Sequence, residues 1–177
     1  MRSTIIILLM FSFFLTSCRK NDIPPNSGIV TINNNREYDD KRQTWYVFGF
    51  LFSKANLVSN LESPSPDITI DNDGTLSNLI LQANSYQDSF YKIGEYADAA
   101  LAEKAFKNLT SPSVPQWVVW ADSIKSNQVW VYRTGSENYA KIRIISTKNE
   151  IRNNLPYGES TFEWLYQPDG SLTFPGK

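Results

Sequence analysis

The pattern of hydrophobic and polar positions along the chain predicts short β-strands joined by turns. The strongest strand is expected at residues 44–52, TWYVFGFLF, where aromatic residues occupy every second position from Tyr46 to Phe52 and Val47 and Leu51 lie on the other face. Because both faces are apolar, we expect this strand to be central and buried. Further strands are expected at residues 67–70, 76–83, 89–93, 116–120, 127–133, 139–146, 161–167 and 172–174, with one weak strand at 29–32.

A single amphipathic helix is expected at residues 96–109. Its apolar stripe comprises Ala99, Ala102, Ala105, Phe106 and Leu109. Asp98 precedes the stripe and is the expected N-cap, and Pro112 and Pro115 follow the end of the helix. The predicted fold class is therefore mainly β (α+β), an antiparallel sheet or meander with one amphipathic helix packed on it.

Two turns in the last third of the chain set the pairing of its strands. TGSEN (134–138) and QPDGS (167–171) contain the glycine and proline positions that tight turns require. If the first turn closes a hairpin, the expected partners are Arg133 and Tyr139, Tyr132 and Ala140, and Trp130 and Ile142. On the next strand, we expect Glu163 to pair with either Lys141 or Arg143.

The stretch DNDG at residues 71–74 has two interpretations. Its carboxylates are typical of a calcium loop, but the third spaced oxygen ligand and the closing glutamate of an EF-hand are missing. Asp-Gly between two strand-like runs is typical of a hairpin, and we favour the turn.

The N-terminal residues indicate export rather than folding. Arg2, the apolar run 5–15 and the small residues that follow have the layout of a secretory signal, and the run is too short to span a bilayer. Residues 15–18, LTSC, resemble the lipobox of bacterial lipoproteins, which implies that Cys18 is acylated and becomes the first residue. We therefore expect a signal peptide at 1–17, a lipidated cysteine with a flexible polar tether at 18–43, and a single β-rich domain at 44–177.

Composition excludes several function classes. The chain has no histidine, a single cysteine, and two methionines, both of which lie in the signal. The mature chain therefore lacks the ligands of usual zinc, copper and iron–sulfur sites and the bases of Ser-His-Asp or Cys-His catalysis. The net charge is −1, and −2 once Arg2 is removed, so a nucleic-acid partner is not expected. No catalytic residue is predicted, and Glu95, Asp98 and Glu103 are interpreted as solvated charges.

The tryptophans also have two interpretations. They are Trp45, Trp117, Trp120, Trp130 and Trp164. They either line a groove for a flat ring or a sugar, or fill the core of a chain without disulfides. Because four of them lie in or beside strand-like runs, we favour the core. Trp117 and Trp120 are the least regular and are the first candidates for binding.

The C-terminal region resembles the HmuY-type haem-binding lipoproteins of Bacteroidota. The matching stretches are VWVYRTGSENYAKIRIIST (129–147) and STFEWLYQPDGS (160–171), with a fainter match in TWYVFGF (44–50) and FSKANLVS (52–59). The resemblance implies a mostly β lipoprotein on the outer membrane, exposed at the cell surface, that binds haem or another small hydrophobic ligand and has an outer-membrane receptor as partner. Family members ligate haem through histidine or methionine, which the mature chain lacks, so no cofactor-binding residue can be assigned.

Two alternatives stay open at this point. One is a structural or protein-interaction lipoprotein of the envelope. The other follows from SFYKIGEYADAALAEKAFKNL (89–109), which resembles the first half of a SPOR peptidoglycan-binding module. Two short sequons are also present: Asp122-Ser123-Ile124 resembles the O-glycosylation sequon of Bacteroidota, and Asn108-Leu109-Thr110 an N-glycosylation sequon.

Overall fold

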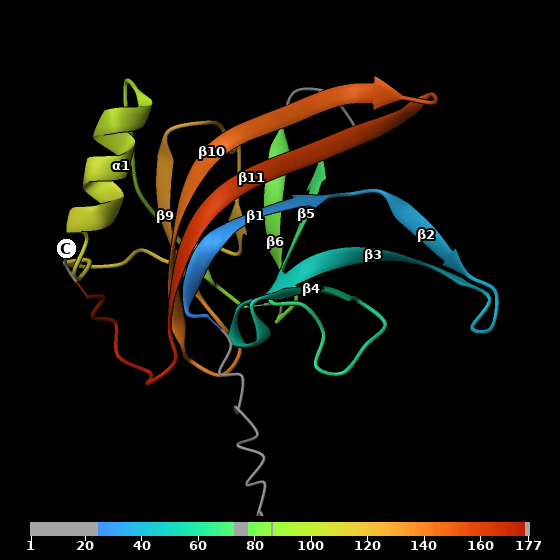
Figure 1. Cartoon of the computed structure of the whole chain (residues 1–177), viewed down its shortest axis with the longest axis horizontal. Coiled ribbons are helices and arrows are strands. Elements are labelled where there is room, and N and C mark those ends of the chain that lie inside the picture. Colours follow the sequence, from blue (N-terminus) through green and yellow to red (C-terminus); the bar gives the residue numbers. More distant parts are fainter. Residues whose placement is uncertain (1–24, 73–77, 86, 176–177) are drawn as a thin grey trace, which may run out of the picture.

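The chain folds into two antiparallel β-sheets that share one hydrophobic core (Figure 1). The computed structural model describes residues 25–72, 78–85 and 87–175. One sheet has the strand order β1-β11-β10-β9-β7, and the other has the order β2-β3-β5-β6-β8 with β4 paired to β3. The strands are β1 (Ser27–Asn33), β2 (Arg36–Asp39), β3 (Thr44–Leu51), β4 (Asn56–Ser59), β5 (Ile68–Asn72), β6 (Leu79–Ala83), β7 (Phe90–Glu95), β8 (Trp120–Ala121), β9 (Gln128–Arg133), β10 (Tyr139–Arg152) and β11 (Leu155–Gln167).

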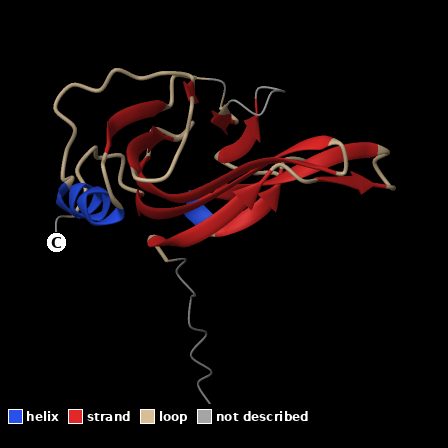
Figure 2. Ribbon diagram, turned by 90° about the horizontal axis from the view of Figure 1, so that it is seen from above, coloured by secondary structure: helices blue, strands red, loops and turns tan. Residues whose placement is uncertain are grey.

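The predicted fold class and helix are confirmed. Helix α1 (Ala99–Asn108) begins at Asp98, whose carboxylate accepts a hydrogen bond of 2.8 Å from the backbone N–H of Leu101. Ala102 and Phe106 are buried where the helix packs on β9 and β10. Figure 2 shows α1 at one end of the molecule, with the longest strands running towards the other end. Within the described ranges, no helix has the length and apolar content needed to cross a membrane.

Aromatic rings from both sheets meet at the centre of the core. Phe52 opens the short 3-10 helix η1 (Phe52–Lys54) and is fully buried. Its ring lies 5.1 Å from that of Phe50, 5.5 Å from Tyr132, 5.8 Å from Trp164 and 6.1 Å from Tyr166. Such pairs contribute about 0.5–1.5 kcal/mol each beyond the area that they bury. Phe52 therefore ties the two sheets together.

The predicted pairing of the β9–β10 hairpin is confirmed residue by residue. Arg133 lies opposite Tyr139, and the pairs Tyr132–Ala140 and Trp130–Ile142 follow. Of the two expected partners of Glu163, Arg143 is the right one, with an ion pair of 2.7 Å. Lys141 instead points to the helix side, where its ammonium group donates to the carbonyl of Leu109 at 3.0 Å.

Strands β10 and β11 are much longer than predicted. They continue past the sheet to a turn at Asn153 and Asn154, both of which have positive φ. The residues of this extension are mostly polar, so the hydrophobic pattern gave no sign of it. The β10–β11 and β2–β3 hairpins both project at the end of the molecule opposite α1 (Figure 1 and Figure 2).

The prediction that residues 44–52 form a fully buried strand is wrong for its first half. Gly49, Phe50 and Leu51 are buried, but Trp45 is 61% exposed and Phe48 is 36% exposed. The first half of β3 pairs with β2 in the projecting hairpin, where Phe48 is on the face of the core residue Phe50 but beyond the core, and Trp45 is on the opposite, outward face.

The expected tether also needs correction. Residues 27–33, of which only 29–32 were predicted as a weak strand, form the seven-residue strand β1, and 36–39 form β2. β1 pairs along its whole length with β11, and Ile32 is only 1% exposed. The folded domain therefore begins before residue 44. Cys18 and the expected signal peptide lie outside the described residues.

Two predicted strands near loops are shorter or missing. In the predicted range 116–120, only Trp120 belongs to a strand, the two-residue β8, and Val118 makes an isolated bridge to Phe90. Residues 172–174 do not form a strand, because Phe174 instead turns inward, donates its N–H to the carbonyl of Thr110 at 2.7 Å and is 2% exposed.

Candidate functional site

A groove lies where the β2–β3 hairpin meets strands β5 and β6. We call it the Trp45 groove, and its volume is about 230 Å³. Its residues come from five places in the chain: Asn34, Arg36, Trp45, Tyr46, Val47, Asn60, Thr69, Ile70, Asp71 and Gln82. The groove forms because only the C-terminal half of β3 pairs with β5. The N-terminal half of β3 pairs with β2 and diverges from β5, which leaves a gap between the hairpin and strands β5 and β6.

Trp45 is held in place by its cross-strand partner. Tyr38 lies opposite it on β2, and the two rings are 5.1 Å apart with an angle of 59° between their planes. The hydroxyl of Tyr38 donates to the side-chain carbonyl of Gln43 at 3.2 Å, which fixes the tyrosine from the turn. An exposed tryptophan supported in this way offers a ring face that loses little conformational entropy when a ligand covers it.

Polar groups surround this ring. Arg36 and Asp71 bring one charge of each sign, and Gln82 brings a carboxamide. The side-chain carbonyl of Asn60 accepts the N–H of Val47 at 3.2 Å, which orients its amide at the rim. These groups offer both donors and acceptors to a ligand.

Two other lining residues have roles within the fold. Asn34 accepts the N–H of Gly158 at 2.8 Å and so fastens the groove to β11. The hydroxyl of Tyr46 donates to Glu37 at 2.6 Å, and this hydrogen bond raises the pKa of the tyrosine. Tyr46 therefore stays a neutral phenol under ordinary conditions.

Trp120 stands on the same sheet, two strands away from β5. It lies opposite Gln82 in the pairing of β6 with β8, while the neighbouring pair, Leu81 and Ala121, is completely buried. Because adjacent pairs in an antiparallel ladder point to opposite faces, Gln82 and Trp120 point away from the core. Trp120 is 55% exposed.

The five tryptophans thus divide into distinct environments. Trp130 and Trp164 are buried, as predicted. The core interpretation is wrong for Trp45 and Trp120. Trp117 is half-buried, with the guanidinium of Arg133 5.0 Å from its ring, so it attaches its loop to the sheet.

A second hollow, the Asp67 pocket, has a volume of about 260 Å³ and lies at the end of β5. Its rim carries hydroxyl and amide groups, including those of Tyr132, Tyr166 and Asn138. The carboxylate of Asp67 accepts the N–H of Phe52 at 2.8 Å, and burial raises the pKa of this carboxyl from 3.8 to about 6. The sequence gave no sign of this environment, because a single aspartate before a strand is common in loops.

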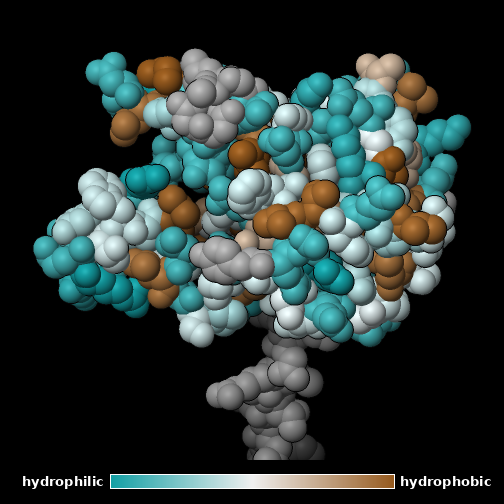
Figure 3. Space-filling view, turned by 180° about the vertical axis from the view of Figure 1, so that it is seen from behind, coloured by the Kyte–Doolittle hydropathy of each residue, from teal (hydrophilic) through white to brown (hydrophobic). Residues whose placement is uncertain are grey.

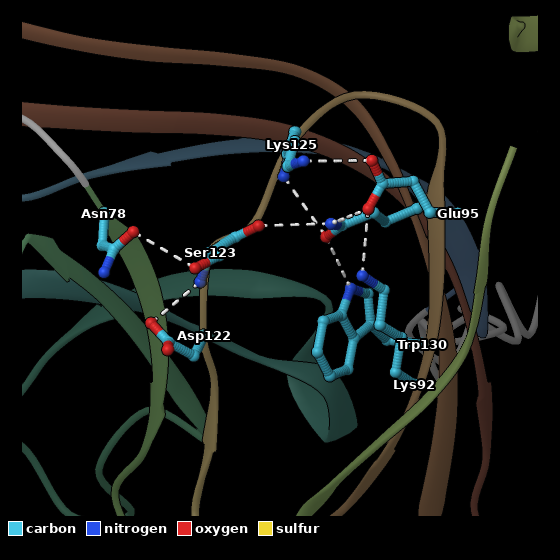
Figure 4. Close-up of polar contacts among 8 residues, drawn as sticks. Asn78, Lys92, Glu95, Asp122, Ser123, Lys125 and Trp130 are labelled. Carbon is cyan, nitrogen blue, oxygen red and sulfur yellow. Dashed lines mark hydrogen bonds and ion pairs between the residues drawn. The ribbon is translucent and has the colours of Figure 1, made fainter. Parts of the chain in front are cut away.

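The three carboxylates considered as solvated charges are all engaged within the fold. Glu95 accepts hydrogen bonds from Gln128, Lys92 and Lys125, which lower its pKa to about 2 (Figure 4). Asp98 caps α1, and Glu103 pairs with Lys107 one turn further along the helix. The structure brings none of them to either hollow.

The O-glycosylation sequon lies beside the Glu95 cluster. The hydroxyl of Ser123 donates to the side-chain carbonyl of Asn78 at 3.1 Å, and its N–H donates to Asp122 at 2.9 Å (Figure 4). Ser123 has a positive φ of 54°, and Ile124 is buried. Any modification of this serine would first have to break its bond to Asn78.

The structure describes only the first two residues of the stretch 71–74, for which a calcium loop and a turn were both considered. β5 and β6 pair as a hairpin up to Asn72 and Leu79, and residues 73–77 lie outside the described residues. Among the residues that are described, no cluster of three or more carboxylate or thiol groups is placed to hold a metal ion.

No protein-family model matches this sequence, and no curated protein matches it. The site must therefore be interpreted from its own geometry.

Proposed function

We propose that this chain is a lipid-anchored binding protein of the cell envelope, without catalytic activity, and that its ligand occupies the Trp45 groove. The observation that supports the proposal most is the exposed ring of Trp45 above polar groups of both hydrogen-bonding types. A ligand with one flat face would cover the ring and form hydrogen bonds with the groups around it. In small-molecule sites, apolar surface usually supplies contact area and a few polar groups fix the orientation of the ligand.

The haem version of this proposal comes from the resemblance to HmuY-type proteins, and the groove does not fit an enclosed, iron-ligated haem. The described hollows have volumes of about 150 to 260 Å³, whereas typical pockets for drug-sized ligands measure roughly 300–1,000 Å³. Tyr46 is adjacent to Trp45 on β3 and so points to the opposite face, where its hydroxyl donates to Glu37, and it is not placed to ligate an iron above Trp45. A porphyrin would have to stack on Trp45 at the surface.

The lipid anchor is tested separately from the ligand. Cys18→Ser should move the chain from the membrane fraction to the soluble fraction and abolish labelling by radioactive palmitate. Continued labelling of the variant would refute the anchor.

The ligand site is tested by titration. The full chain in detergent is titrated with haemin while absorbance and tryptophan fluorescence are recorded, in parallel with Trp45→Ala. Binding that the variant weakens supports the site. An absorbance spectrum identical to that of free haemin excludes the haem version, and a change that Trp45→Ala leaves intact excludes the groove as its location.

A protein-interaction role is the second candidate, and the loop before β8 favours it. Val114 is 73% exposed, Val118 46% and Val119 42%, so the loop has three exposed apolar side chains within six residues. Seen from behind, however, hydrophobic residues are dispersed among hydrophilic ones and do not form one large patch on that face (Figure 3). Co-purification of an outer-membrane protein that is lost in Val114→Asp would favour this role.

A further inference from the structure

We infer that the ligand of this sheet is a neutral oligosaccharide chain, with Trp45 and Trp120 stacking on different sugar units. The inference rests on the proposed function, because it uses the Trp45 groove and extends it across β6 to β8. It assigns a role to Trp120, which the groove alone does not include.

The two tryptophans belong to one continuous surface. Gln82 lines the groove that Trp45 borders, and the same Gln82 is the cross-strand partner of Trp120. Paired residues of neighbouring antiparallel strands project from the same face of the sheet. A ligand that passes over Gln82 from the groove therefore arrives at Trp120.

The separation of the rings favours a chain over a single ring. Trp45 is on β3 and Trp120 on β8, with β5 and β6 between them. Three strand spacings amount to about 14 Å across the sheet, and the register puts Trp120 in the row of Gly49, four residues or about 13 Å along β3 from Trp45. One sugar ring or one small flat molecule cannot cover both tryptophans, whereas successive units of an extended chain can.

The groups between the rings match the chemistry of a sugar. Asn60, Gln82 and Asp71 carry carbonyl or carboxylate oxygens, and the amides and Arg36 carry N–H donors. Sugar hydroxyls both donate and accept, so each can pair with either kind of group. The opposite charges of Arg36 and Asp71 offset each other, which favours a neutral chain over an acidic one.

A sugar chain would combine stacking on the indoles with hydrogen bonds from its hydroxyl groups. The apolar face of a sugar ring stacks on an indole, while its equatorial hydroxyls reach the polar groups at the edge. The groove is shallow and its polar lining is open to water, which suits a ligand that keeps much of its own hydration.

The test is isothermal titration calorimetry of the full chain in detergent with cellohexaose, xylohexaose, mannohexaose, maltohexaose and chitohexaose, and with the corresponding monosaccharides. At least one hexaose should bind, and its monosaccharide should bind at least tenfold more weakly. Trp45→Ala and Trp120→Ala should each weaken hexaose binding tenfold or more. Leu155→Ala is the matched control, because Leu155 is 68% exposed at the tip of the β10–β11 hairpin, and it should leave binding unchanged.

The outcomes separate this inference from the proposed function. If no hexaose binds, the inference is overturned, and the proposed function still stands when Trp45→Ala weakens the binding of haemin. If a hexaose binds but Trp120→Ala has no effect, the extended contact is overturned. If Trp45→Ala changes the binding of neither hexaose nor haemin, the proposed function fails as well. Circular dichroism of both variants checks that the fold is kept, which their exposure predicts.

Discussion

Asp67 allows a quantitative test of the structure, because its carboxyl group is buried and accepts a hydrogen bond from the backbone of Phe52, whose ring contacts residues of both sheets. Its pKa is raised from 3.8 to about 6 by burial, against the opposing effect of the hydrogen bond from Phe52. Below about pH 4 the group is protonated in both the folded and the unfolded chain. Between about pH 4 and pH 6 only the folded chain holds the proton, so its stability falls as the pH rises through this window. Above it, the full cost of the buried charge is present.

The size of the effect follows from the shift. A rise of roughly two pH units corresponds to about 3 kcal/mol of lost folding free energy at neutral pH. Asp67→Asn removes the charge and keeps a carbonyl oxygen that can accept the N–H of Phe52. We therefore expect Asp67→Asn to exceed the natural chain in stability by up to about 3 kcal/mol at pH 8 and to match it near pH 4.

The assay is urea unfolding followed by tryptophan fluorescence at several values between pH 4 and pH 8. With a urea slope of about 1–3 kcal/mol per molar, the full 3 kcal/mol would raise the midpoint at pH 8 by about 1–3 M. Asp40→Asn is the control, because Asp40 is exposed in the β2–β3 turn and loses the same charge. Other titrating groups are shared by the variant and the natural chain and cancel in the difference. An Asp67→Asn variant whose stability follows the same pH curve as the natural chain would refute the reasoning.

Four further changes test other parts of the fold by urea unfolding. Asp98→Ala removes the cap of α1 and should cost about 1 kcal/mol, whereas an asparagine there should cost much less. Gly49→Ala would place a methyl group 2.7 Å from side-chain atoms of Pro66 and Thr69, so a loss below about 1 kcal/mol would contradict the close approach of β3 and β5. Phe52→Ala should cost about 3–5 kcal/mol, and Trp45→Ala about 0.5–1.5 kcal/mol, the contribution of its pair with Tyr38. Equal losses for these two variants would contradict the assignment of core and groove.

The elements that the sequence predicted well are those in which local chemistry and tertiary packing agree. Helix α1 has its cap, its stripe and its terminating prolines within twenty residues, and all act locally. The β9–β10 register follows from one turn, because a tight turn fixes every later pair. Both predictions needed no knowledge of distant parts of the chain.

The elements that were missed depend on partners far away in the sequence. β1 is only weakly apolar, and β11, which pairs with it, lies more than a hundred residues later. The environment of Asp67 is made by Phe52, in η1, and Tyr132, on β9, which are eighty residues apart in the sequence. Polar extensions such as residues 147–160 form strands because their backbones pair with each other, and side-chain alternation does not report that.

The candidate site could not be predicted for the same reason, because its residues are far apart in the sequence. Trp45 and Trp164 both stand in alternating aromatic strands, and the alternation says only which residues share a face. Trp164 faces the second sheet and is buried, whereas Trp45 is out of phase with the core residue Phe50 and so lies on the opposite, uncovered face of β3. Arg36, Asn60 and Gln82 join Trp45 only through the pairing of four strands.

The contrast between these two tryptophans also says what the fold requires. Trp164 touches the rings of Phe50 and Phe52 and is 3% exposed, so packing accounts for its presence. Trp45 contacts the ring of Tyr38 at the end of a projecting hairpin, and most of its surface remains in water. Leaving an indole in water gives up about 25 cal/mol for each Å² of apolar area that burial would remove. A ligand that covers this ring recovers that free energy, and in the absence of such a ligand the side chain contributes to the stability of the fold only through its contact with Tyr38. For this reason Trp45→Ala should weaken ligand binding strongly and destabilise the fold only modestly, and the ratio of the two effects measures how far the tryptophan serves recognition instead of folding.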